Sequence, residues 1–128
     1  MSIKLENLTY TYMPGSPFAA TAVHNVSFEI GDGEFFALIG HTGSGKTTIA
    51  MHLNALLQPA SGRVLVDGQD INQNGADRRE VRRKVGMVFQ YPEYQLFEET
   101  VNRDVAFGPK NLGLSDAECE ERVAEALA

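Results

Sequence analysis

Hydrophobic and polar residues alternate along the beginning of the chain, in the pattern of strands that bury one face. Residues 3–10 alternate weakly, and residues 23–30 alternate with one slip of phase. The short segment at residues 63–66 contains three apolar residues after an arginine and is closed by an Asp-Gly turn, which predicts one more strand. Together these segments predict an antiparallel sheet layer built from residues 1–34 and 60–76.

Two later segments are apolar without alternation, which is typical of strands buried on both faces of a parallel sheet. They are residues 35–39 and residues 85–89. Residues 46–57 carry apolar side chains at helical spacing, and the predicted inward stripe is Ile49, Leu53, Leu56 and Leu57. The predicted fold class is therefore α/β, with this helix directly after the first of the two buried strands.

Helix signals dominate the last third of the chain. Residues 78–84 are predicted to form a short basic helix with Asp77 as its cap, and we interpret its charges as a solvated face rather than as a nucleic-acid patch. A further helix is predicted from about Thr100 to Asn111. The segment 115–118 fits a capping box, and the helix behind it is expected to turn inward Val123, Ala124 and Leu127.

Residues 40–48 match the phosphate-binding loop pattern G-x-x-x-x-G-K-[ST]. The loop lies between a predicted strand and a predicted helix, which is the context that gives the pattern its meaning. A plain Gly-rich turn before a helix is the alternative, and the combined match disfavours it. The candidate phosphate-binding residues are Gly40, His41, Thr42, Gly43, Ser44, Gly45, Lys46, Thr47 and Thr48.

The residue types in this loop suit a magnesium-bound nucleotide. Gly43 and Gly45 let successive backbone N–H groups point inward, and the helix behind them adds a partial positive charge. Lys46 would contact the β- and γ-phosphates, the Thr47 hydroxyl would ligate Mg²⁺, and Thr48 would contact the phosphates too. The loop by itself leaves open whether the nucleotide is hydrolysed, transferred or only bound.

Composition narrows the range of partners. The chain has 128 residues and a net charge of −6, from 11 basic and 17 acidic side chains. An acidic chain is a poor binder of nucleic acid, and no nucleic-acid partner is expected. A single cysteine, Cys119, excludes an internal disulfide. The three histidines lack the spacing of a metal site, and we interpret His52 as structural.

These motifs resemble those of the ATPase subunits of ATP-binding-cassette transporters, and especially of energy-coupling factor transporters. The phosphate loop is the first shared element, with Thr47 in place of the family's usual serine. Gln90, at the end of a predicted strand, matches the glutamine of the family's Q-loop, and Tyr12 matches the aromatic residue that stacks on adenine. Tyr10 is the less favoured candidate, since strand alternation directs it like Leu8.

The subfamily resemblance rests on longer stretches of sequence. Residues 89–109 are similar to the coupling-factor pattern, as are the segments 39–43 and 52–57. The long loop at residues 14–20 resembles that of the second of the two ATPase paralogues in these transporters.

The resemblance implies a function and a set of partners. The cofactors are ATP and Mg²⁺, with Lys46 and Gln90 as catalytic residues and Thr47 and Gln90 as the magnesium contacts. The intact subunit would hydrolyse ATP to power a membrane importer of vitamins or transition-metal ions, as a peripheral protein on the cytoplasmic face of the cell membrane. Its partners would be a second ATPase subunit that sandwiches ATP, a transmembrane coupling subunit and a substrate-binding membrane subunit.

The family's signature segment and its Walker B strand are not found in these residues, so the chain resembles the N-terminal part of one ATPase domain. Residues 35–58 and 85–90 would belong to an incomplete P-loop core of the RecA type. Residues 91–128 would form the Q-loop and the start of a helical subdomain. We expect the 128-residue chain alone to be inactive, because the candidate general base is missing.

Two other functions are compatible with the phosphate loop. A soluble P-loop nucleotide or metabolite kinase would share the loop, but not the Tyr12 platform or Gln90 at the end of a strand. A non-catalytic module that holds ATP without turnover is the second alternative, and it fits the 128 residues taken literally.

Overall fold

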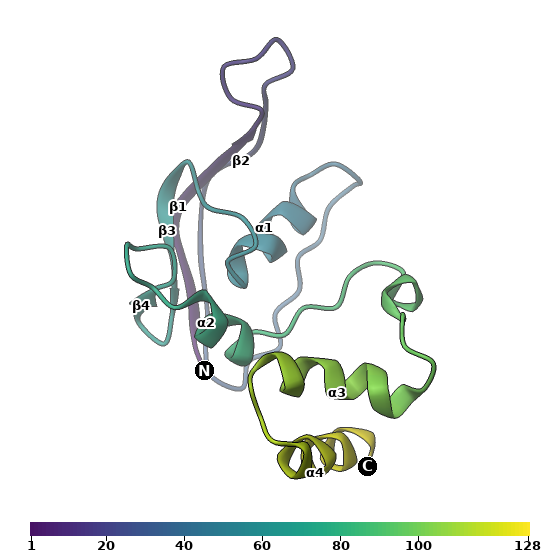
Figure 1. Ribbon diagram of the computed structural model, residues 1–128. Coiled ribbons are helices and arrows are strands. Elements are labelled where there is room, and N and C mark those ends of the chain that lie inside the picture. Colours follow the sequence, from purple (N-terminus) through teal and green to yellow (C-terminus); the bar gives the residue numbers. More distant parts are fainter. The chain divides into compact units, whose positions relative to one another are not determined.

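The computed structural model describes all 128 residues, which form two compact units at residues 1–87 and 88–128. The first unit contains a four-stranded antiparallel sheet in the order β2-β1-β3-β4 and the helices α1 and α2 (Figure 1). The second unit contains the short 3-10 helix η1 and the helices α3 and α4. The bounds are β1 Ile3–Tyr12, β2 Ala20–Ile30, α1 Lys46–Leu53, β3 Ser61–Val66, β4 Gln69–Asp70, α2 Arg78–Lys84, η1 Pro92–Gln95, α3 Val101–Asn111 and α4 Asp116–Leu127.

Each of the two long strands contains a bulge at an asparagine with a left-handed backbone. Asn7 in β1 has a φ of 50°, and Asn25 in β2 has a φ of 51°. The pairing register of the two strands shifts near both positions. A bulge inserts one residue into a strand, so the alternation of side chains changes phase there. The bulge in β2 explains why the alternation of apolar and polar residues in its sequence slips by one position.

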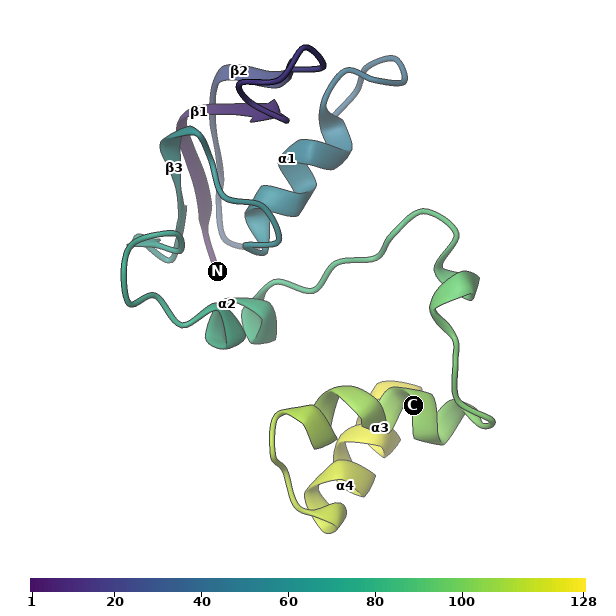
Figure 2. The ribbon, with the colours of Figure 1, turned by 45° about the horizontal axis from the view of Figure 1, so that its top comes forward.

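The bulge at Asn7 keeps one face of β1 apolar along its length. Ile3 and Leu5 precede the bulge and Leu8 follows it at an odd separation, yet all three are buried in one core cluster. The helix α1 lies against this face of the sheet (Figures 1 and 2). The other buried members of the cluster are Val23, Ile49, Ala55, Val64, Val66, Ile71 and Val81.

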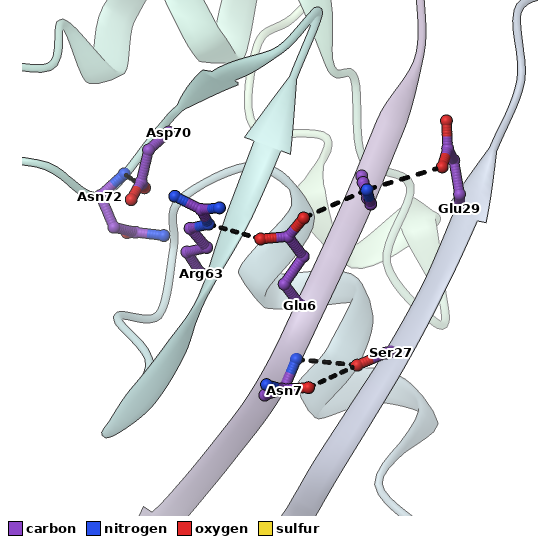
Figure 3. A network of polar contacts seen from close by, with 8 residues as sticks. Glu6, Asn7, Ser27, Glu29, Arg63, Asp70 and Asn72 are labelled. Carbon is purple, nitrogen blue, oxygen red and sulfur yellow. Dashed lines mark hydrogen bonds and ion pairs between the residues drawn. The ribbon is translucent and has the colours of Figure 1, made fainter.

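Hydroxyl side chains satisfy the backbone at both bulges. Ser27 Oγ accepts from the backbone N–H of Asn7 at 2.8 Å and donates to its Oδ1 at 3.1 Å (Figure 3). Thr9 Oγ1 accepts from the backbone N–H of Asn25 at 3.0 Å. Because both donors find partners, the bulges leave no N–H group of these asparagines unpaired.

The face of the sheet opposite the core carries a small charge network. Arg63 and Lys4 both contact the carboxylate of Glu6, and Lys4 also approaches Glu29 (Figure 3). The Arg63 guanidinium first, and then the Lys4 ammonium, hold the pKa of the Glu6 carboxyl below its usual range. Exposed pairs of this kind add little to stability, so the network marks the solvent face rather than holding the sheet together.

Neither segment predicted as a buried parallel strand forms a strand in the structure. Residues 35–39 and 85–89 lie outside the sheet and join no strand ladder. Phe35 is 98% exposed and Ile39 is 96% exposed. A strand exists only when its N–H and C=O groups pair with a neighbour, and no segment of residues 1–128 pairs with these two. The prediction of two parallel strands is therefore wrong for this structure.

The helix after the phosphate loop is shorter than predicted. It ends at Leu53 rather than Leu57, because the next residues turn away and Ala55 adopts a left-handed φ of 57°. Leu56, expected on the inward stripe, is exposed. Ile49 is buried and Leu53 packs against the core, as predicted, and the helix also buries Thr48 and His52.

The caps predicted at Asp77 and Ser115 are confirmed. Asp77 accepts from the backbone N–H of Arg79 and caps α2. The helix α3 begins after Thr100, as predicted, and the Thr100 side chain caps it. Ser115 and Glu118 form the reciprocal capping box of α4. The hydrogen bonds from Ser115 hold the pKa of the Glu118 carboxyl below its usual range.

The helices α3 and α4 pack as a pair with a narrow buried stripe. Its buried residues are Ala106, Cys119 and Val123. Ala124 and Leu127, predicted to face inward, are exposed, because one helix packed on one other covers only a single line of side chains. No helix of the structure combines the length and the apolar character needed to cross a bilayer.

Gly62 in β3 lies where the sheet tolerates no side chain. Its φ is 83°, and a Cβ there would lie 2.3 Å from the carbonyl oxygen of Asn7 at the bulge. Gly62→Ala should lower the free energy of unfolding by about 3 kcal/mol or more, since backbone strain and a clash with backbone add.

Gly68 provides the matched control, with a φ of 77° and no atom within 4 Å of the Cβ position. Gly68→Ala should therefore lose only about 1 to 2 kcal/mol. Denaturant unfolding of both variants makes the comparison, and equal losses would show that the contact between β3 and the bulge is unimportant.

Candidate functional site

The phosphate loop, residues 40–48, enters α1 through two glycines with a left-handed backbone. Gly43 has a φ of 84° and Gly45 a φ of 87°. A Cβ on Gly45 would lie 2.4 Å from the carbonyl oxygen of Ala22 in β2, so only glycine lets the end of the loop rest on this strand. The contact fixes where α1 begins relative to the sheet.

The first turn of α1 has no cap of its own. The N–H of Ile49 donates to Gly45 O at 2.9 Å, whereas no side chain caps the N–H groups before it and no acidic residue lies in the first turn. The other α-helices are each capped by a side chain, from Asp77, Thr100 and Ser115. The start of α1 therefore suits an external anion, which its N–H groups and partial positive charge would stabilise.

Lys46 folds back over the loop. Its Nζ donates to the carbonyl oxygens of Gly40 and His41, both at 2.7 Å, and to Ser44 Oγ at 3.3 Å. An anion in the loop would offer this ammonium a charged acceptor, which forms stronger hydrogen bonds than the three neutral oxygens do. The structure thus holds a positive charge beside the uncapped start of the helix.

Tyr12, at the end of β1, lies next to the same helix. Its hydroxyl is 3.1 Å from Thr48 Oγ1, and the residue is 39% exposed. Tyr10 contacts it, with ring centroids 4.9 Å apart, so both tyrosines lie on the α1 side of β1. Strand alternation therefore does not separate the two candidates. The two tyrosines differ in burial, because Tyr10 is half-buried against His52 whereas Tyr12 is exposed.

The other predicted site residues lie at the surface. His41, Thr42, Ser44 and Thr47 are exposed, and His41 Nδ1 lies 2.8 Å from the carbonyl oxygen of Thr42. Gln90 is also exposed and belongs to the second unit, so its share in the site stays a prediction. The structure brings together the loop, Lys46 and Tyr12 within the first unit.

His52 is the neighbour of the site that the sequence pattern left out. It is 0% exposed, and its Nδ1 lies 2.7 Å from the carbonyl oxygen of Thr48. The sequence spacing of His52 and Thr48 indicates this contact, because residues one helical turn apart lie on the same face of a helix. The complete burial of His52 agrees with its interpretation as structural, and the structure adds a contact with the last residue of the phosphate loop.

The donor set suits a magnesium ion that is bound together with phosphates. Thr47 presents an exposed hydroxyl oxygen at the start of α1. Mg²⁺ in nucleotide sites usually takes one or two protein oxygens and completes its shell with substrate phosphates and water. Thr47 therefore fits the role of one ligand to a nucleotide-bound cation.

A glycine-rich loop that rests on an antiparallel sheet and leads into an uncapped helix is the arrangement of a P-loop ATPase domain. The family model described as "ABC transporter" matches residues 23–128, and the chain belongs to this family. Among curated relatives, it is 57% identical to the energy-coupling factor transporter ATP-binding protein EcfA2 of Clostridium tetani and 55% identical to that of Clostridium perfringens. These alignments cover 99% of this chain but 44% and 45% of the relatives, so the chain spans less than half of their length.

Solved structures of ATP-binding cassettes share the fold. The structure of cbiO1 from Clostridium perfringens, described as part of the ABC transporter complex cbiONQ, matches with 37% identity and a TM-score of 0.79. That alignment covers 98% of this chain and 48% of the other. The cassette MJ0796 bound to ADP and Pi matches with 30% identity and a TM-score of 0.76, over 98% and 55% of the two chains. The predicted α/β class, of the P-loop ATPase type, is confirmed.

The contact between Gly45 and β2 predicts a local effect on α1. Gly45→Ala should push the loop off Ala22 and speed hydrogen exchange of the Ile49 amide, whose acceptor is Gly45 O. Gly43→Ala is the control, because its φ is equally unusual but no atom lies within 4 Å of its Cβ position. If exchange at Ile49 rises equally in both variants, backbone strain alone explains the effect.

Proposed function

We propose that residues 40–48 bind the phosphates of Mg-ATP and that Tyr12 contacts the adenine. The uncapped first turn of α1, with the Lys46 ammonium held beside it, is the observation that carries this proposal. In the bound state the Lys46 Nζ would leave its carbonyl partners for the β- and γ-phosphates. The Thr47 hydroxyl would contact the magnesium ion, and Thr48 the phosphates.

We further propose that the intact subunit hydrolyses ATP to power an importer of the energy-coupling factor type. Its relatives carry that name, and the phosphate loop supplies the electrostatic clamp that phosphoryl transfer requires. The nucleophile would be water, with Gln90 helping to position it and contacting the magnesium ion. Lys46 would stabilise the charge that develops on the transferred phosphoryl group.

The proposed partners are a second ATPase subunit, a transmembrane coupling subunit and a substrate-binding membrane subunit, met at the cytoplasmic face of the membrane. The segment after Gln90 supports a docking role. Tyr91 is 58% exposed, Tyr94 83%, Leu96 68% and Phe97 63%. Exposed apolar residues gathered in one short segment are typical of an interaction site.

The proposed domain plan keeps these parts within one ATPase domain. Residues 1–34 and 60–76 would be its antiparallel layer, and residues 35–58 and 85–90 would join its P-loop core. Residues 91–128 would be the Q-loop and the beginning of the helical subdomain.

Replacing Lys46 should weaken nucleotide binding strongly. Lys46→Ala removes charge-assisted hydrogen bonds worth about 1.5 to 3 kcal/mol, which raises the Kd for Mg-ATP about 10- to 100-fold. Isothermal titration calorimetry of the chain measures it. Lys110→Ala, in α3, is the control for lost net charge, and an equal effect of the two substitutions would refute the role of the loop.

The docking segment predicts a separation between assembly and nucleotide binding. In the full-length subunit, Tyr94→Ala should reduce co-purification with the membrane subunits while the Kd for Mg-ATP changes less than about twofold. Phe18→Ala is the matched control, because Phe18 is a 77% exposed aromatic residue in the β1–β2 loop. Equal losses of assembly and ATP binding in Tyr94→Ala would instead indicate a packing role.

A further inference from the structure

Four residues of β1 and α1 form a closed ring of contacts beside the phosphate loop, made by four side chains and the backbone carbonyl group of Thr48. The Tyr12 hydroxyl lies 3.1 Å from Thr48 Oγ1, and the carbonyl oxygen of Thr48 lies 2.7 Å from His52 Nδ1. The His52 ring meets the Tyr10 ring at a centroid distance of 4.8 Å, and Tyr10 meets Tyr12 at 4.9 Å. Thr48 is 6% and His52 0% exposed, so the exposed Tyr12 ring stands on a buried base.

We infer that Tyr10 and His52 are positioning residues that hold the Tyr12 ring in register with the phosphate loop. The inference rests on the proposed function, in which Tyr12 contacts the base of a purine nucleoside triphosphate. Thr48 is the link between the two subsites. It lies two residues after Lys46 in the uncapped first turn of α1, and its hydroxyl is paired with Tyr12.

The hydrogen bonding of His52 indicates a role other than stability. A carbonyl oxygen only accepts, so Nδ1 carries the proton in the contact with Thr48. Nε2 is then an acceptor, and it is buried with no partner. An unpaired buried acceptor destabilises a fold, so an apolar ring of similar shape would serve a core better. A polar ring at this place is explained by its bond to Thr48.

The geometry leaves Tyr12 free to stack on a base. Tyr10 meets it with an interplanar angle of 89°, and an edge-to-face contact covers at most one face of the Tyr12 ring. The bond to Thr48 restricts the rotamers of Tyr12 before the ligand arrives, so less side-chain freedom is lost on binding. This preorganisation strengthens the contact with the base and leaves the contacts with the phosphates unchanged.

Comparing the Kd values of two ligands distinguishes contacts with the base from contacts with the phosphates. The ligands are Mg-ATP and magnesium-bound inorganic tripolyphosphate, which lacks the base. Tyr12→Phe keeps the ring and removes only the hydroxyl, and His52→Phe removes the bond to Thr48. Each should raise the Kd for Mg-ATP about 3- to 10-fold in calorimetric titration of the chain, and that for tripolyphosphate less than twofold.

The double variant should bind Mg-ATP no more weakly than the single variant with the higher Kd, because both substitutions break the same ring of contacts. The unfolding midpoint of His52→Phe should be unchanged or raised.

Thr11→Val is the matched control, because it removes a hydroxyl contact of similar length, 3.0 Å to Thr21 Oγ1, from the next position of β1. It should leave both Kd values unchanged. Unchanged ATP binding in Tyr12→Phe, or a parallel loss of both ligands in either variant, would overturn the positioning role. A parent chain that binds neither ligand, or a Lys46→Ala variant that binds both as the parent does, would overturn the proposed function itself.

Discussion

One extra residue in β1 determines how this protein's sheet is built. The bulge at Asn7 shifts the alternation of side chains, so Leu8 joins the same buried face as Leu5. Without the shift, the second half of the strand would turn its apolar side chains to solvent, because a slip of one residue exchanges the two faces. Two partners accommodate the bulge: Ser27 pairs with its backbone, and Gly62 leaves room for its carbonyl group.

The candidate site inherits its geometry from that strand and its neighbour. Because the bulge sets the phase of β1, both tyrosines at its end reach α1, and Tyr12 meets Thr48. The second strand contributes the carbonyl oxygen of Ala22, on which Gly45 rests. The start of α1 is therefore located by contacts with two strands, and the same contacts place Tyr12 beside the phosphate loop.

The positive potential at the phosphate loop arises partly because α1 lacks a capping side chain. Asp77, Thr100 and Ser115 cap the first turns of the other α-helices, whereas the cap position of α1 is Gly45, which has no side chain. Lys46 adds a positive charge that only neutral oxygens hold in place. Both features favour an anion, and they arise from the same short stretch of sequence.

The sequence by itself determined the features that depend on neighbouring residues. The phosphate loop, the helix caps at Asp77 and Ser115 and the antiparallel strands follow from local patterns, since turns, caps and alternation involve residues a few positions apart. The apolar character of residues 35–39 wrongly predicts a strand, because it indicates burial only, and a strand also needs a neighbour with which to pair. The burial of His52 and the different depths of Tyr10 and Tyr12 likewise depend on tertiary structure. Both depend on how a bulged strand meets a helix, which no spacing along one segment records.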